Sequence, residues 1–161
     1  MNPSIANVGI IWERREIRNQ TGAAEADIVA FEAKYGVKLP PIVRRYFSEL
    51  NGTKVGELGM DDEYLIGFWH LEHVRPMKEE CPEFVTTEEP NLFIFADYSI
   101  WAHGYAIRLA SAEDAETAIF LIGGNRPLRI ARTFEEFLQK YAAGDEGMLF
   151  GSGEVQNPES L

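Results

Sequence analysis

The spacing of apolar residues predicts a short amphipathic helix after the first 20 or so residues of the chain. Ile28, Phe31 and Tyr35 recur at helical spacing, with acidic residues near the start, where carboxylates interact favourably with the helix dipole. Gly36 follows, at the position where a helix C-terminus often needs a residue with positive φ. We therefore expect the helix to end at this glycine.

A second short helix is predicted immediately afterwards. Pro40 and Pro41 suit its first turn, because proline lacks only an N–H that would be unpaired there, and Asn51-Gly52 suits its end. Its apolar stripe consists of Ile42, Val43, Tyr46, Phe47 and Leu50. Helices this short are marginal in water, so the sequence predicts a helical hairpin whose apolar side packs on a sheet.

The rest of the chain contains the pattern of such a sheet and of a closing helix. Gly123-Gly124-Asn125 is typical of a tight turn that makes the last two strands antiparallel. Thr133 to Glu136 matches a capping box, and an apolar helical stripe runs from there to Tyr141. The predicted strands are Tyr64 to Trp69, Leu92 to Ala96, Tyr105 to Leu109, Ala118 to Ile122 and Pro127 to Ala131.

The order of these elements favours an α+β fold over alternating βαβ units. The length of 161 residues fits a single domain over residues 1–161, with a core at about 25–145. The Gly- and Ser-rich tail, 146–161, is expected to be flexible or to dock through Met148, Leu149 and Phe150. Around Ile10 to Trp12, the N-terminal segment fits either a helix or an edge strand.

The composition argues against a membrane protein, a secreted protein and a nucleic-acid-binding protein. No apolar run reaches the ~20 residues of a membrane span, and no basic region precedes the first apolar run, so we expect neither membrane insertion nor a signal peptide. The single cysteine, Cys81, fits a reducing, cytoplasmic setting. A net charge of -11 argues against direct binding of nucleic acid, which needs clustered Lys and Arg.

The negative charge is concentrated in the middle of the chain. Residues 57–116 contain 14 acidic and 3 basic side chains, whereas the remainder contains 12 of each. Most of the excess lies in three predicted loops, 57–63, 79–89 and 113–116. Such a distribution accelerates encounter with a basic partner, although acidic loops also serve solubility alone.

The sequence gives little indication of a catalytic or metal-binding site. His70 and His73 could share one face of a short helix and hold a metal, but the HLEH pattern is neither HExxH nor accompanied by a second ligand cluster. Cys81 lacks the surroundings of a nucleophile, and paired acids in loops are usually solvated surface. We therefore expect no catalytic, cofactor-binding or metal-ligating residues. Trp69 and Trp101 fit either the core or a surface that displays an aromatic side chain to a ligand.

Two motifs in the helical hairpin, together with two later segments, resemble the SUKH superfamily of Smi/Knr-type domains. The motifs are Glu32-x-x-Tyr35-Gly36-x-x-Leu39-Pro40 and Tyr46-Phe47-x-x-Leu50-Asn51-Gly52; the segments are Ile94 to Leu109 and Ile130 to Tyr141. The resemblance implies a curved, mostly antiparallel sheet with helices packed on one side, an N-terminal helical hairpin and a C-terminal helix. The acidic stretch Cys81 to Glu89 and the segment Trp101-Ala-His103 depart from the pattern.

The same resemblance implies a protein-binding role without catalysis. Bacterial members are regarded as immunity proteins that neutralise toxins, often nucleases, and fungal members as scaffold-like regulators. We therefore expect a cytoplasmic immunity protein that occludes a basic toxin domain, with an adaptor for an endogenous partner, and less so a metal-dependent enzyme, as alternatives. The expected partner-binding residues are Asp61, Asp62, Glu63, Trp69, Glu79, Glu80, Glu88, Glu89 and Trp101.

Overall fold

The computed structural model describes most of the chain as five helices, a single 3-10 turn and two sheets. The described residues are 2–18, 21–55, 58–59, 66–80, 91–98, 103–112, 116–123, 127–145 and 147. The helical elements are α1 (Pro3–Arg14), α2 (Glu25–Tyr35), α3 (Pro41–Glu49), η1 (Leu71–His73), α4 (Met77–Glu80) and α5 (Phe134–Ala143). No helix among these residues is long and apolar enough to cross a membrane.

The N-terminal segment, for which the sequence fits either a helix or a strand, forms α1. Asn2 caps this helix: its side-chain oxygen accepts hydrogen bonds from the backbone N–H groups of Ser4 and Ile5 at 2.9 and 3.2 Å. Pro3 occupies the first helical position, which its fixed φ favours. The other end is held by Trp12, whose fully buried indole N–H donates to the Tyr141 hydroxyl of α5 at 2.9 Å.

The predicted helical hairpin is confirmed as α2 and α3. Gly36 ends α2 in the left-handed conformation, with φ of 66°, and its N–H donates to the Glu32 carbonyl. After α3, Asn51 and Gly52 also have positive φ, 54° and 76°. Four residues of the apolar stripe, Val43, Tyr46, Phe47 and Leu50, are buried, and Ile42 is half-buried.

The main sheet has the strand order β3-β5-β6-β7-β8, and β4 also pairs with β5. Every pairing is antiparallel, as is that of the separate pair β1-β2. All five predicted strands are present, whereas β1, β2 and β4 were not predicted; the predicted turn around Gly124 lies outside the described residues. The strands are β1 (Lys54–Val55), β2 (Leu58–Gly59), β3 (Ile66–Phe68), β4 (Arg75–Pro76), β5 (Leu92–Tyr98), β6 (His103–Arg108), β7 (Ile119–Ile122) and β8 (Leu128–Ala131).

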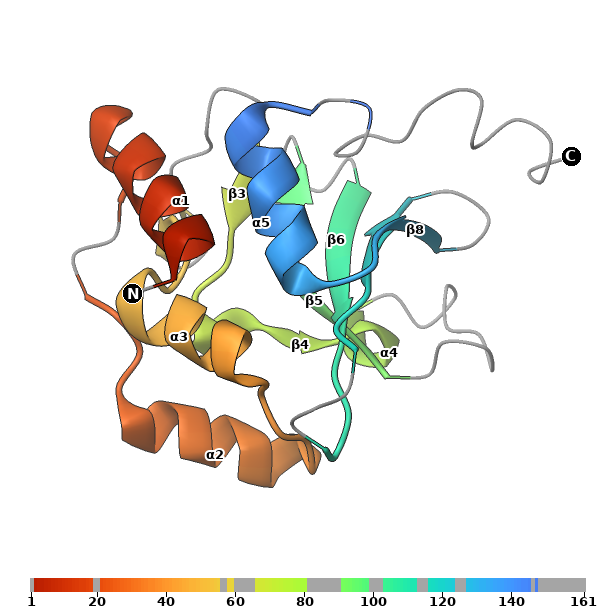
Figure 1. Cartoon of the computed structure of the whole chain (residues 1–161). Coiled ribbons are helices and arrows are strands. Elements are labelled where there is room, and N and C mark those ends of the chain that lie inside the picture. Colours follow the sequence, from red (N-terminus) through yellow and green to blue (C-terminus); the bar gives the residue numbers. More distant parts are fainter. Residues whose placement is uncertain are drawn as a thin grey trace, which may run out of the picture.

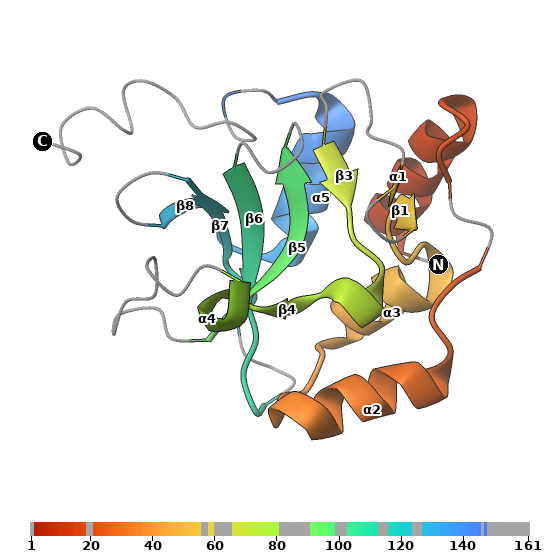
Figure 2. The ribbon, with the colours of Figure 1, turned by 180° about the vertical axis from the view of Figure 1, so that it is seen from behind.

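The helices α1 and α5 pack side by side on one face of this open, curved sheet, and α3 lies below them (Figures 1 and 2). Aromatic side chains fill the space between the layers: Phe95 of β5 contacts Phe134 and Phe137 of α5, with ring centroids 5.8 and 5.6 Å apart. The α+β fold that the sequence predicts is therefore confirmed. In both views α2 runs along the lower edge of the molecule, apart from the main helical layer.

The capping pattern before α5 is present in altered form. The Thr133 hydroxyl accepts a hydrogen bond from the Glu136 N–H at 3.1 Å, as expected. The Glu136 carboxylate, however, accepts from the N–H of Arg132 at 2.9 Å, one residue before the cap. Both contacts pair donors at the start of the helix, so the sequence located this boundary correctly.

Candidate functional site

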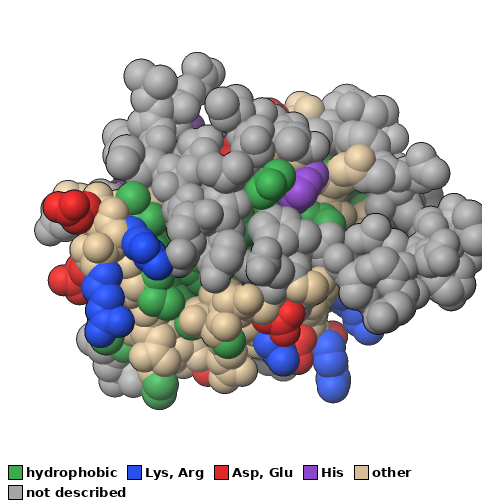
Figure 3. Space-filling model, turned by 90° about the horizontal axis from the view of Figure 1, so that it is seen from above, with side chains coloured by type: hydrophobic (Ala, Val, Ile, Leu, Met, Phe, Trp, Pro, Cys, Tyr) green, Lys and Arg blue, Asp and Glu red, His purple; other side chains and the backbone are tan. Residues whose placement is uncertain are grey.

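The predicted partner-binding surface falls largely outside the described residues. Its members there are Asp61, Asp62, Glu63, Glu88, Glu89 and Trp101. On the face seen in Figure 3, the described acidic and basic side chains lie beside one another, with apolar patches between them. At those six positions, the expected partner-binding surface therefore stays a prediction.

Of the three remaining predicted residues, Trp69 directly follows β3, and Glu79 and Glu80 lie on α4. Trp69 is 6% exposed and belongs to the hydrophobic core, with the Arg75 guanidinium 5.5 Å from its ring centroid. It therefore has little surface with which to contact a partner. Glu79 is exposed, and Glu80 pairs with Arg75 at an Oε2–Nε distance of 3.0 Å. Of these three residues, only Glu79 is exposed.

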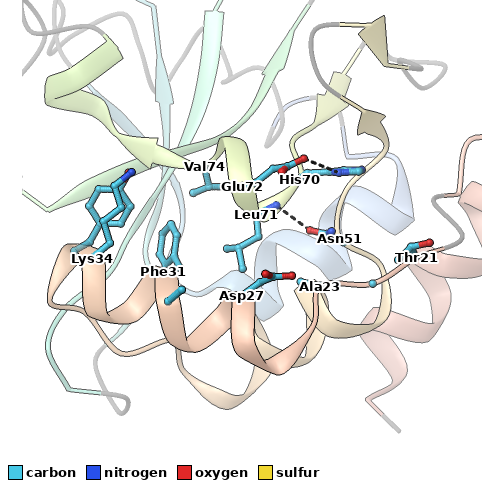
Figure 4. Close-up of a pocket in the computed structure, with 13 residues that line it drawn as sticks. Thr21, Ala23, Asp27, Phe31, Lys34, Asn51, His70, Leu71, Glu72 and Val74 are labelled. Carbon is cyan, nitrogen blue, oxygen red and sulfur yellow. Dashed lines mark hydrogen bonds and ion pairs between the residues drawn. The ribbon is translucent and has the colours of Figure 1, made fainter.

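A hollow in the described structure lies between α2 and η1, and we call it the α2–η1 groove. It has a volume of about 420 Å³ and is lined by Thr21, Gly22, Ala23, Asp27, Ala30, Phe31, Lys34, Tyr35, Asn51, His70, Leu71, Glu72 and Val74. Figure 4 shows α2 forming one wall and the η1 segment the other. Phe31, Leu71 and Val74 are buried and supply the apolar part of the lining.

One end of the groove is held by tight backbone packing. The Asn51 side chain accepts a hydrogen bond from the N–H of Leu71 at 2.8 Å and so fixes η1 to the end of α3. The Ala23 N–H donates to the Phe47 carbonyl at 2.8 Å. A Cβ on Gly22 would overlap the Ser48 carbonyl oxygen, so only glycine allows the chain to run this close to α3.

The α2 wall is held by a buried carboxylate. Glu32 is 6% exposed; its oxygens accept from the Leu39 N–H at 2.7 Å and from Arg44 Nη2 at 2.9 Å. Arg44 also donates to Glu25 at 2.6 and 2.8 Å. Burial lowers the pKa of Arg44, but the two carboxylates outweigh it, so the pKa is raised and the guanidinium stays charged. This network locks α2 to α3.

Charged side chains lie at both ends of the groove. Asp27 and Glu72 extend from opposite walls near the His70 end, and Lys34 lies toward the other end of α2 (Figure 4). The pKa of His70 is lowered: burial disfavours its charged form and His73 repels it, which outweighs the attraction of Glu72. At neutral pH, His70 is therefore uncharged.

The two histidines proposed as alternative metal ligands converge on one carboxylate oxygen. His70 Nδ1 and His73 Nε2 lie 3.9 and 3.7 Å from Glu72 Oε1. Within the described ranges, no group of three or more His, Cys, Asp or Glu side chains is arranged to hold a metal ion. Cys81 lies outside those ranges.

A second hollow of about 370 Å³ adjoins the first. It shares Lys34 and Tyr35 with the α2–η1 groove and extends past Phe93 to Lys78 and Glu79. The ammonium of Lys34 lies 5.1 Å from the Tyr35 ring centroid, at the junction of the two hollows. The exposed residue Glu79 of the predicted surface therefore lies along a concave band that begins at α2.

Sequence reasoning missed the α2–η1 groove because its lining comes from three separate segments: residues 21–35, Asn51, and 70–74. In the sequence, Phe31 and Tyr35 are recognised as helix-stripe residues, and Tyr35 also as part of a family motif, but neither is recognised as the lining of a groove. The available signals were Gly22 ahead of a helix and Asn51-Gly52 after one, since both mark close approach of backbone segments. A Cβ on Gly52 would lie 2.5 Å from the Trp69 carbonyl oxygen, which confirms such an approach.

Comparison with known proteins supports the same reading of the hairpin motifs. A search of curated proteins found no match. A family model, that of the SMI1 / KNR4 family (SUKH-1), matches residues 22–140, from the glycine before α2 nearly to the end of α5. The matched range covers both hairpin motifs and most of the lining of the α2–η1 groove. This chain belongs to the SMI1 / KNR4 (SUKH-1) family.

Proposed function

We propose that this protein is a cytoplasmic immunity protein that binds a toxin and occludes its active or substrate-binding surface. Family membership over residues 22–140 is the observation that carries the proposal, since a protein-binding role is consistent with the SUKH family. The charge of the chain adds to it: a net -11 favours encounter with a basic toxin such as a nuclease, whose own surface must hold phosphates.

The structure is suited to binding because the family motifs build a rigid frame. Glu32, Tyr35 and Gly36 form or end α2, and the backbone N–H of Leu39 donates a hydrogen bond to the Glu32 carboxylate. None of these side chains needs to move for the hollows beside α2 to be open. A rigid surface loses little conformational entropy on binding, which favours tight inhibition.

The test begins with capture of the partner from the native host on the purified protein, followed by identification by mass spectrometry. The captured protein is then expressed in a sensitive bacterium with and without this chain. We expect growth to stop without the chain and to recover with it, and the purified pair to form a complex in which the partner's activity is lost.

A partner that is harmless when expressed alone would overturn the immunity proposal and favour the adaptor or regulator role instead. Recovery of growth without formation of a complex would also contradict it, because occlusion requires direct binding. An unrelated acidic protein of similar net charge serves as the control, since non-specific electrostatic attraction would then rescue growth equally well.

A further inference from the structure

The α2–η1 groove combines an apolar lining with exposed charges at its rim. Its volume of about 420 Å³ lies within the range of sites that enclose side chains or small ligands. Phe31 and Leu71 lie at the bottom, 7% and 3% exposed, whereas Asp27, Lys34 and Glu72 are exposed above them. A side chain that enters is thus desolvated on one side and meets charge on the other.

The charges are separated along the groove. At one end, Asp27 and Glu72 approach from the two walls, and Asp27 Oδ2 accepts a long hydrogen bond of 3.3 Å from the Ala24 N–H. Glu72 is 73% exposed, and the imidazole nitrogens of His70 and His73 lie 3.9 and 3.7 Å from its Oε1. Lys34, at the other end, disfavours a second cation there. The arrangement therefore favours one cation in one position.

From this complementarity we propose that the α2–η1 groove receives a segment of the protein partner that carries an arginine or lysine beside an apolar residue. The basic side chain lies between Asp27 and Glu72, and the apolar one covers Phe31. The inference rests on the proposed function, in which the partner is a basic protein. Arginine suits the site well, because its planar fork can bond two carboxylates while its stem packs on apolar surface.

The walls are preorganised for such an occupant. The Glu32–Arg44 network holds α2, and the bond from Leu71 N–H to Asn51 holds η1. The cation would therefore meet two carboxylates already placed, and interfaces commonly obtain most of their binding energy from a few such anchoring side chains.

The experiment probes the folded protein against an array of immobilised short peptides in which two adjacent central positions sample every pair of amino acids. We expect selection of Arg or Lys next to an apolar residue. The double variant Asp27→Asn with Glu72→Gln should lose this selection and bind the selected peptides about tenfold more weakly, the loss expected for removing a charged contact. Asparagine retains the oxygen that accepts from Ala24, so the start of α2 is preserved.

Glu16→Gln with Glu116→Gln, which removes two negative charges from exposed residues outside the groove, is the matched control and should leave selection unchanged. Lys34→Glu provides an independent variant: a second acidic end should enrich a second basic position in the peptides. Absence of any basic preference, or equal binding by the double variant and the control, would overturn the inference.

Growth rescue separates this inference from the proposed function. If the double variant protects cells from the captured toxin as well as the wild type does, the immunity role stands and the partner docks elsewhere, for example on the predicted acidic loops. If the peptides are selected as expected but no captured partner is toxic, the groove keeps its assigned ligand chemistry and the immunity proposal fails.

Discussion

Replacement of Glu32 by alanine should destabilise the fold more than any other single removal of a charge in the helical hairpin. The carboxylate is 6% exposed and accepts three hydrogen bonds from two donor atoms: one from the buried Leu39 N–H at 2.7 Å and two from Arg44 Nη2, both at 2.9 Å. Alanine leaves the Leu39 donor buried without a partner and takes from Arg44 the more buried of its two carboxylates.

The magnitude follows from these two losses. An unpaired buried N–H costs about 1–3 kcal/mol. Arg44 is 33% exposed and keeps Glu25, so its loss is discounted for solvent screening to about 1 kcal/mol. Glu32→Ala should therefore lower the free energy of unfolding by roughly 2–4 kcal/mol. Glu32→Gln keeps an acceptor for Leu39 and should cost only about 1 kcal/mol.

Urea denaturation followed by circular dichroism gives these values directly, with the melting temperature expected to fall by about 2–4 °C per kcal/mol in a chain of this size. Glu25→Ala is the matched control: it removes the exposed carboxylate from the same arginine and should cost less than about 1 kcal/mol. If Glu25→Ala and Glu32→Ala are equally mild, the buried network does not lock α2 to α3.

Further substitutions should change the free energy of unfolding, measured by urea denaturation, as follows. Tyr46→Phe should leave stability unchanged or raise it, because the buried hydroxyl has no hydrogen-bond partner among the described residues; a loss of stability on removal of the hydroxyl would reveal such a bond. Phe47→Ala should cost about 3–5 kcal/mol, because its side chain is buried. Gly36→Val should cost about 1–2 kcal/mol, because an added Cβ meets no atom within 4 Å and only the positive φ disfavours the side chain. Gly36→Asn should cost less, since asparagine tolerates positive φ better than valine does. Equal costs for the two variants would contradict this explanation. Burial lowers the pKa of His103 in the folded protein, so the unfolded chain binds the proton more readily, and the free energy of unfolding should fall as the pH drops below about 6.5. His103→Gln should reduce this pH dependence, and an unchanged dependence would refute the assignment to His103.

The parts of the fold that sequence predicts well are those decided within a few residues. Gly36 ends α2 because positive φ at that position favours glycine, and the motif from Thr133 locates the start of α5. The strands at β5 to β8 are recognised by their apolar and β-branched runs. In each case the local sequence pattern and the tertiary packing favour the same conformation, so the neighbouring residues in the sequence are enough to predict it.

The features that sequence leaves open depend on distant partners. α1 remained ambiguous because its apolar residues fit a strand equally well; Asn2-Pro3 was the local signal for a helix, and the contact between Trp12 and Tyr141 cannot be read from either residue alone. The α2–η1 groove likewise exists only where three segments meet. The burial of Trp69 in the core, with Arg75 of β4 beside its ring, depends on contacts that the pattern of residues 64–69 does not reveal.

The bond between Trp12 and Tyr141 has a practical consequence for what counts as one folding unit. Both residues lie just outside the family-matched range 22–140, yet the Trp12 ring is fully buried and lies 5.0 Å from that of Phe68 and 6.3 Å from that of Tyr46. A chain trimmed to the matched boundaries would uncover these rings and invite aggregation. The boundary of the recognisable family and the boundary of the cooperative unit are therefore different, and α1 belongs inside the second.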